Sequence, residues 1–336
     1  MAEPDGFRAA HLRPADLVQR ASVARRFYLE GQSKLEIADE LGLNRWKVAR
    51  MIEEARRSGL VHIEIRLPAA IDAELSDRLA HAYGLRRAIV LDTPDDPSSQ
   101  LRADLGQVAA ALLSEIAGPN DVIGLAWGRT LGAMTAALGD LPRCAVVQLT
   151  GAVSAVSVDE NSQELVRRVA EVTGGTPYPI YAPMVVSDRA TAAALRSQRE
   201  VAEALDWHSR VTIAVVAVGS WEPPDSQLYN YLAPADRDRL YEAGVRAEVC
   251  ASFISREGSE VPTDLRDRII AITGDKLRKI PEIVVVAGGA IKAGAIGSVL
   301  RGGFATTLVT DVAVARHLLE AEPHPAHHND GTASPV

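Results

Sequence analysis

Short apolar segments alternate with helical segments along residues 87–320, and this alternation constrains the fold more than any other feature of the chain. The apolar segments, rich in Val, Ile and Leu, predict strands at residues 87–91, 122–126, 145–149, 211–218, 247–253, 283–287 and 306–310. Helices are expected at residues 72–82, 100–116, 130–138, 162–172, 190–194, 200–205, 234–242, 265–272, 290–300 and 311–320. We therefore predict the α/β class, with a doubly wound, mostly parallel sheet that binds ligands at the carboxyl ends of its strands.

The residues before Pro68 follow a different pattern, that of a helix-turn-helix of the winged type. Helices are predicted at residues 16–29, 34–41 and 45–58. Ser33 and Glu36 fit a capping box, Gly42 suits a left-handed turn, and Asn44 suits the cap of the third helix. Residues 61–67 alternate between apolar and polar side chains, which predicts a strand that forms a wing or a dimer contact. We place a first domain at residues 14–68, a second at 70–320 and a disordered tail at 321–336.

The polar face of the predicted third helix has the character of a DNA recognition helix. Arg50 and Lys47 lie where they reach base edges or phosphates, and residues at the helix starts would hold the DNA backbone. For Trp46 two alternatives stay open, stacking on DNA and packing on the preceding helix. Basic side chains on an arbitrary helix usually only solvate it, but the helix-turn-helix context favours DNA contact. The predicted DNA-binding residues are Ser33, Lys34, Arg45, Trp46, Lys47, Arg50 and Arg57.

The net charge of −8 is unevenly distributed. Residues 1–66 carry 12 Lys and Arg against 10 Asp and Glu, a balance of +2, which leaves −10 for the rest of the chain. The larger part repels a polyanion, so DNA contact falls to the first part. The apolar runs are shorter than the roughly 20 residues of a membrane span, and the first residues lack a signal-peptide core, so we expect a cytoplasmic protein without a membrane partner. Cys144 and Cys250 are expected to be reduced core residues.

Three loops that follow predicted strands offer groups that bind anions. In Trp127-Gly128-Arg129-Thr130 the amides at a helix start combine with a hydroxyl and a guanidinium. The second loop, 148–151, offers an amide, a hydroxyl and a glycine, and the third, 287–292, offers bare amides and the ammonium of Lys292. Each loop alone is also compatible with a helix cap or a tight turn. The three together favour a small phosphorylated ligand.

Motifs for other chemistries are absent from the sequence. It has no G-x-x-x-x-G-K-[ST], and no G-x-G-x-x-G follows the first strand of a unit, so ATP and NAD are disfavoured. It also has no G-x-S-x-G, no H-E-x-x-H and no cluster of Cys and His. We therefore expect no catalytic residues, no metal site and no cofactor.

At this point the chain resembles the SorC family of sugar-responsive bacterial transcriptional regulators, over residues 16–320. The likeness is carried by residues 35–43 (LEIADELGL), 61–65 (VHIEI), 122–131 (VIGLAWGRTL), 148–151 (QLTG), 286–289 (VAGG), Lys292, 295–296 (AI) and 308–311 (LVTD). The resemblance implies a DNA-binding domain followed by an effector domain similar to sugar-phosphate isomerases and hexosamine-phosphate deaminases. Such a domain binds a sugar or its phosphate without converting it, in a homo-oligomer, a dimer or commonly a tetramer.

The resemblance also implies an effector site. Its residues are Gly128, Arg129, Thr130, Gln148, Thr150, Gly151, Glu248, Gly288, Gly289 and Lys292. Gly219, at the end of a predicted strand, either lines the same site or simply closes a turn, and we count it among the predicted effector residues. Around Glu248 the chain departs from the family, which often has a Gly-Asp pair and two aromatic residues there, so the identity of the sugar does not transfer.

These observations favour a DNA-binding regulator, most simply a repressor of a carbohydrate operon, whose affinity for operator DNA is set by a sugar or sugar phosphate. The alternative is an isomerase or deaminase fused to a DNA-binding head, with Asp121, Glu248 or Asp264 as the base; only Glu248 lies in a suitable loop or strand end. A third alternative is that the large domain serves only for oligomerisation and binds no ligand.

Overall fold

The computed structural model describes residues 14–61, 70–93, 98–153 and 161–321. The chain divides into two compact units, Met1–Arg66 and Leu67–Val336, which we describe separately. The strand predicted at residues 61–67 and the tail predicted at 321–336 lie outside the described residues, apart from Val61 and Ala321. Within the described part, we find no helix with the length and apolar character that crossing a membrane requires.

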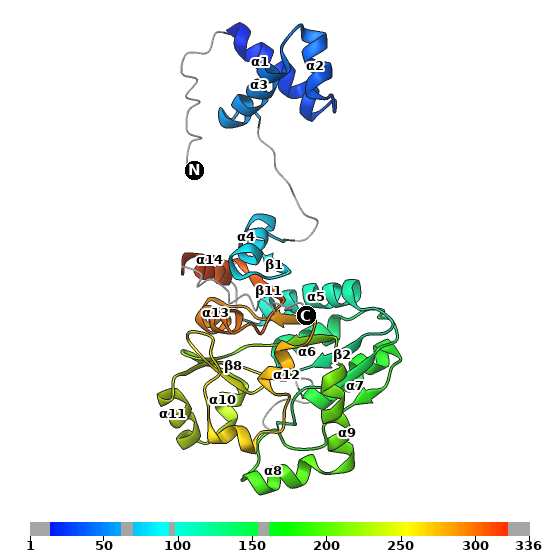
Figure 1. Ribbon diagram of the computed structural model, residues 1–336, viewed down its shortest axis with the longest axis vertical. Coiled ribbons are helices and arrows are strands. Elements are labelled where there is room, and N and C mark those ends of the chain that lie inside the picture. Colours follow the sequence, from blue (N-terminus) through cyan, green and yellow to red (C-terminus); the bar gives the residue numbers. More distant parts are fainter. Residues whose placement is uncertain (1–13, 62–69, 94–97, 154–160, 322–336) are drawn as a thin grey trace, which may run out of the picture. The chain divides into compact units, whose positions relative to one another are not determined.

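The first unit consists of the three predicted helices, α1 (Pro14–Tyr28), α2 (Lys34–Leu41) and α3 (Arg45–Arg57) (Figure 1). The predicted caps are confirmed: Ser33 and Glu36 form the capping box, and the Asn44 side chain accepts from the amide of Trp46. Gly42 ends α2 at a φ of 62°, a conformation that glycine adopts without a Cβ penalty. The small core is formed by Val23, Ile37, Ala38, Val48, Met51 and Ile52.

The second unit is built on a seven-stranded sheet in which every neighbouring pair is parallel. Its order is β1-β11-β10-β5-β2-β3-β4, from the strands β1 (Arg87–Leu91), β2 (Val122–Leu125), β3 (Ala145–Gln148), β4 (Pro177–Tyr178), β5 (Ile213–Val216), β10 (Glu282–Val286) and β11 (Thr307–Asp311). The central strands are almost wholly apolar because helices cover both faces. The predicted parallel α/β fold is therefore confirmed.

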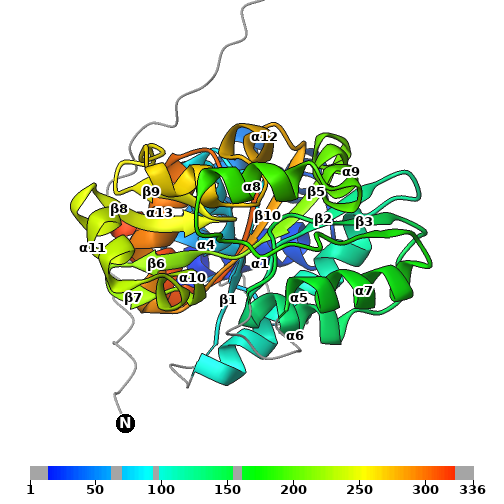
Figure 2. The ribbon, with the colours of Figure 1, turned by 90° about the horizontal axis from the view of Figure 1, so that it is seen from below.

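Helices pack on both faces of this sheet. Figure 2 shows α5 (Ser98–Ile116), α6 (Arg129–Ala137) and α7 (Ser162–Thr173) together on one side, and α9 (Arg199–Trp207) and α12 (Gly274–Arg278) on the other. Three further helices form a row that begins beside β1: α4 (Ala73–Tyr83), α14 (Val312–Glu320) and α13 (Ala293–Arg301). Helix α4 packs against β1 and α14, and α14 packs against α13. Helix α8 (Arg189–Arg196) precedes α9.

The direction of winding reverses between β2 and β5. From β2 the chain proceeds outward through β3 to β4, whereas from β5 it proceeds the opposite way through β10 to β11. The loops that leave β2 and β5 therefore diverge to opposite faces and open a crevice at the carboxyl end of the sheet. This switch point is where a ligand site is expected.

A second, four-stranded antiparallel sheet, in the order β7-β6-β8-β9, is inserted between β5 and β10. Its strands are β6 (Gly219–Trp221), β7 (Pro224–Asp225), β8 (Val245–Val249) and β9 (Ser252–Ser255), and α10 (Gln227–Tyr231) and α11 (Pro234–Glu242) connect β7 to β8.

Two predicted elements are corrected by this insertion. Residues 247–253 are not one strand of the main sheet but a hairpin, which turns at Cys250 and Ala251 with φ values of 49° and 61°. The helix predicted at residues 265–272 is only a short 3-10 turn, Asp264–Arg268, because the following residues, Ile270 and Ile272, bond to loops of the main sheet.

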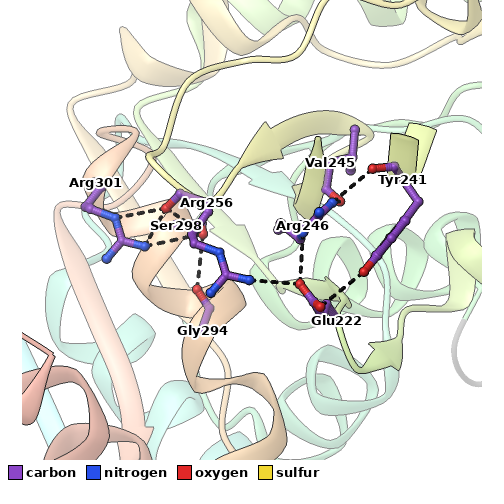
Figure 3. A network of polar contacts seen from close by, with 8 residues as sticks. All are labelled: Glu222, Tyr241, Val245, Arg246, Arg256, Gly294, Ser298 and Arg301. Carbon is purple, nitrogen blue, oxygen red and sulfur yellow. Dashed lines mark hydrogen bonds and ion pairs between the residues drawn. The ribbon is translucent and has the colours of Figure 1, made fainter. Parts of the chain in front are cut away.

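A polar network fastens the antiparallel sheet to α13 (Figure 3). The carboxylate of Glu222 accepts from Tyr241 at 3.1 Å and from Arg246 and Arg256 at 2.9 Å each. The carbonyl oxygen of Arg256 in turn accepts from Ser298 and Arg301 of α13. Because α13 also follows the loop after β10, the small sheet is held beside the carboxyl end of the main sheet.

Candidate functional site

The polar face of α3 presents the basic side chains that the sequence predicted. Val48, Met51, Ile52 and Ala55 are buried on the other face, so Arg45, Lys47, Arg50 and Arg57 are left exposed. The 13 residues of α3 carry five basic side chains and two acidic ones. The face is therefore electropositive, as contact with phosphates requires.

Trp46 is 83% exposed, so it does not pack on the preceding helix. Packing on the preceding helix therefore does not fit this structure, whereas an indole that is free to stack on DNA does. Arg50 has a 72% exposed side chain and lies 3.6 Å from Glu54, which also pairs with Arg20 of α1 at 3.0 Å. This exposed ion pair is weak, so Arg50 can exchange it for a phosphate or a base.

The two residues at the start of α2 have local partners. The ammonium of Lys34 lies 5.7 Å from the centre of the Phe27 ring. The Ser33 hydroxyl accepts from the amide of Glu36, and its own hydrogen stays available to an acceptor such as a phosphate oxygen.

A cavity of about 290 Å³ opens at the switch point of the main sheet. It is lined by the loops that follow β2, β5 and β10, together with residues of α5 and of the small sheet. Eight of the eleven predicted effector residues line it: Gly128, Arg129, Thr130, Gly219, Glu248, Gly288, Gly289 and Lys292. Residues from four distant parts of the chain therefore meet around one cavity.

Helix α6 begins at this cavity. Its N-cap is Gly128, at a φ of 138°, which carries no side chain to satisfy the first amides. The amides of a first helical turn lack partners within the helix and carry the positive end of its dipole. The start of α6 therefore directs donors and partial positive charge at the cavity, and Arg129 adds a full charge.

Two cations of the cavity share one carboxylate. Asp225, at the end of β7, lies 2.7 Å from a guanidinium nitrogen of Arg129 and 3.3 Å from the Lys292 ammonium. Burial by itself raises the pKa of Asp225, but Lys292 and Arg129 outweigh burial and hold that pKa below its ordinary value. Burial lowers the pKa of Lys292, and Asp225 opposes this shift. The Lys292 ammonium also donates to the carbonyl of Val218 at 3.1 Å, which aims it at the cavity.

Glu248 also lines the cavity, where it is buried and holds local structure. One of its oxygens accepts from the Ser226 hydroxyl at 3.0 Å, and the other accepts from the amide of Ala251 at 3.3 Å. Burial raises its pKa. A Cβ at Gly219 would lie 2.1 Å from a Glu248 oxygen, so glycine is required there for Glu248 to occupy this position.

The glycine pair after β10 is packed rather than open. A Cβ at Gly288 would lie 2.5 Å from an Asp311 oxygen, and the amide of Gly289 donates to the same oxygen at 2.6 Å. Asp311 also caps α14 through the amide of Val314. The loop is therefore fixed by the end of the neighbouring strand, β11.

The remaining three predicted residues, Gln148, Thr150 and Gly151, do not line the cavity. The Gln148 amide donates to Ser162 and accepts from the amide of Ile180, and Gly151 lies against the backbone of Met184. Their loop follows β3, one strand beyond the switch point, and segments near residues 183 and 270 pack over it. All three are left out of the proposed site.

The sequence reasoning missed Asp225 and Ser226, together with Arg102 and Gln227, which also line the cavity. Asp225 and Ser226 directly follow Pro223 and Pro224, and Asp225 ends a strand of only two residues, which gives no periodic signal. The nearest available signal was Ser226 itself, a good N-cap, which caps α10. Among the described residues no group of three or more His, Cys, Asp or Glu side chains is placed to hold a metal ion.

Comparison with known proteins places this fold and cavity in a family. The family model described as "Putative sugar-binding domain" matches residues 68–320, which include every residue that lines the cavity. The chain belongs to this family. The resemblance to SorC-type regulators noted in the sequence is confirmed by it.

Relatives of this sugar-binding family member span nearly the whole chain. It is 27% identical over 312 residues to the uncharacterized transcriptional regulator YjhU of Escherichia coli K12, which covers 89% of this chain and 93% of the relative. It is 26% identical to the deoxyribonucleoside regulator of Bacillus subtilis 168, over 88% of this chain and 95% of the relative.

Solved structures share the fold. The full-length sorbitol operon regulator SorC of Klebsiella pneumoniae is 22% identical, with a TM-score of 0.71 over 91% of this chain and 99% of that chain. A domain of a sugar-binding transcriptional regulator of Arthrobacter aurescens TC1 is 26% identical, with a TM-score of 0.68 over 76% of this chain and 100% of that chain.

Proposed function

We propose that this protein is a transcriptional regulator that binds operator DNA through α2 and α3 and whose affinity for DNA is set by a sugar or sugar phosphate in the cavity. Relatives named as regulators of sorbitol and deoxyribonucleoside systems support this proposal. The observation that carries it is the cavity at the switch point, where Arg129, Lys292 and the start of α6 converge.

The charge of the cavity determines the class of ligand. Two cations and a helix N-terminus favour an anionic group, and the backbone groups of the lining suit the hydroxyls of a sugar. A volume of about 290 Å³ is at the small end of ligand pockets, which suits a single monosaccharide phosphate.

The arrangement of Glu248 supports binding without turnover. A general base needs a free lone pair directed at the substrate. Each Glu248 oxygen accepts one hydrogen bond, from the Ser226 hydroxyl or from the amide of Ala251, and these two bonds direct the carboxylate at the Cys250–Ala251 turn. Residues with φ above zero and a side chain are strained, so this turn depends on such support.

The DNA-binding part of the proposal places α3 in the major groove. Arg50 and Lys47 would contact bases or phosphates, Trp46 would stack on the DNA, and Ser33, Lys34, Arg45 and Arg57 would hold the backbone. We further propose a homo-oligomer, a dimer or tetramer, because paired recognition helices about 34 Å apart match half-sites one DNA turn apart. A ligand that binds two states of such an assembly unequally shifts DNA affinity by its differential affinity.

Ligand binding is tested by a screen on the wild-type chain, followed by a substitution of Lys292. The wild-type chain is screened by thermal shift with sugar phosphates and polyol phosphates, since a ligand of the native state raises stability in proportion to RT ln(1 + [L]/Kd). For a ligand found in this way, we expect Lys292→Gln to raise the Kd at least about tenfold, because it removes a charge-assisted bond of about 1.5–3 kcal/mol. The matched control is Lys279→Gln, which removes an exposed lysine distant from the cavity lining. An unchanged Kd for Lys292→Gln contradicts the assignment of the cavity.

A further inference from the structure

Asp225 occupies the position in the cavity that suits an anionic ligand best. Its two carboxylate oxygens separately contact Arg129, at 2.7 Å, and Lys292, at 3.3 Å. These are the same two cations that the proposed function gives to the ligand. An incoming anion therefore meets a pair of cations that already contact a carboxylate of the protein, with one net positive charge left between the three groups.

The backbone around Asp225 is fixed, so only its side chain has freedom to leave. Ser220 of β6 pairs with Asp225, and Trp221 pairs with Pro224. On the other side, the Ser226 hydroxyl donates to Glu248 and accepts from the amide of Tyr229 as the cap of α10. The Asp225 side chain is 28% exposed, so its carboxylate can rotate toward water without a change in the sheet.

We propose that Asp225 is an internal competitor for Arg129 and Lys292 that raises the Kd of every anion and so sets the concentration that a ligand must reach to fill the cavity. The inference depends on the proposed function to the extent that the cavity binds an anion. A competitor that occupies the cations for most of the time raises the apparent Kd of every anion by the same factor.

That common factor has unequal consequences for different ligands. A carboxylate carries one charge and replaces one carboxylate by another, with no gain in charge at Arg129 and Lys292. A phosphate dianion brings a second charge and three oxygens, so it gains bonds that Asp225 does not make. At one ligand concentration, this common rise in Kd can therefore leave a sugar acid unbound while a sugar phosphate, whose own Kd is lower, still binds; the ratio of the two Kd values does not change.

The experiment compares the full wild-type chain with Asp225→Asn by isothermal titration calorimetry, with inorganic phosphate and with acetate as probes. Asn keeps the shape of the side chain but loses the charge that attracts both cations. We expect Asp225→Asn to lower the Kd of both probes by the same factor, at least about tenfold, and to make acetate binding measurable. The charge-matched control is Asp140→Asn, at an exposed aspartate outside the cavity lining, which should leave both Kd values as in the wild type.

A result opposite to this expectation would assign Asp225 a different role. An unchanged or higher phosphate Kd for Asp225→Asn would overturn the inference, because Asp225 would then hold Arg129 and Lys292 in place for the ligand. Should Asp225→Asn fail to fold, a crystal structure of the wild type with phosphate decides the question. Phosphate at Arg129 and Lys292 with the Asp225 carboxylate displaced supports competition, and phosphate bound with both Asp225 contacts intact refutes it.

Failure of this inference is distinguishable from failure of the proposed function. If phosphate binds the wild type, Lys292→Gln abolishes that binding and Asp225→Asn does not improve it, only the competitor role is lost. If phosphate binds neither the wild type nor Asp225→Asn, the anion site itself is refuted together with the inference.

Discussion

His208 makes the stability of the second unit depend on pH, by an amount that the structure allows to be worked out. The residue is 3% exposed, and its Nε2 donates to the backbone carbonyl of Gln148 at 2.9 Å. Burial lowers the pKa of His208 from an ordinary 6.5 to about 4. Between these two values the unfolded chain binds a proton that the folded chain does not, so stability falls as the pH falls. The difference of about 2.5 pKa units corresponds to ~3 kcal/mol, present above pH ~6.5 and lost by pH ~4.

The assay is urea unfolding of the full chain, followed by tryptophan fluorescence at several values of pH from 7.5 to about 4. Trp207 precedes His208 and stacks on Tyr178 with ring centres 4.0 Å apart, so it reports on this part of the unit. His208→Gln retains an amide donor but has no group that titrates in this range. We expect its free energy of unfolding to fall by ~3 kcal/mol less than that of the wild type between pH 7 and pH 4.

The matched control is His81→Gln, at an exposed histidine of α4, which should keep the pH dependence of the wild type. Parallel curves for His208→Gln and the wild type would refute the reasoning, since another group would then carry the dependence.

Two further predictions concern the two proposed binding surfaces. Arg50→Ala should weaken binding to a DNA duplex selected by the wild-type chain by about 1–3 kcal/mol if Arg50 reads a base, as measured by fluorescence anisotropy at fixed salt. An affinity equal to that of the wild type would remove Arg50 from the interface. The control is Arg199→Ala, at an exposed arginine of the second unit. Gly219→Ala would place a Cβ 2.1 Å from a Glu248 oxygen and 2.6 Å from the Ser226 hydroxyl, so we expect a loss of about 1–3 kcal/mol in stability and weaker ligand binding. Gly294→Ala is its control, because a Cβ there meets nothing within 4 Å; similar losses in both variants would contradict the packing argument.

Elements with strong local signals were predictable from the sequence. The stripe of Val48, Met51 and Ile52 and the caps at Ser33 and Asn44 involve residues at most four apart, so periodicity and capping chemistry suffice to locate the three helices. The parallel strands were predictable for a similar reason, because strands buried on both faces are continuous apolar runs.

The errors arise where distant residues decide the structure. The segment 247–253 is apolar enough for a buried strand, but it forms a hairpin, and its turn is supported by Glu248, which accepts from Ser226, 22 residues away. Gln148 ends β3 and Lys292 lies in the loop after β10, and each of these strands adjoins a strand of the switch point. Segments near residues 183 and 270 pack over the loop after β3, however, whereas the loop after β10 lines the cavity. These tertiary contacts, which sequence alone does not provide, separate Lys292 at the cavity from Gln148 in the core.

The central claim is that occupation of the cavity changes how strongly the chain holds DNA. The most direct test measures the affinity of the full wild-type chain for its selected DNA duplex with and without a saturating sugar phosphate found in the thermal-shift screen, at one salt concentration. We expect the Kd for DNA to change about 5- to 150-fold, which corresponds to a coupling of about 1–3 kcal/mol. The same DNA affinity with the cavity empty and filled would contradict it.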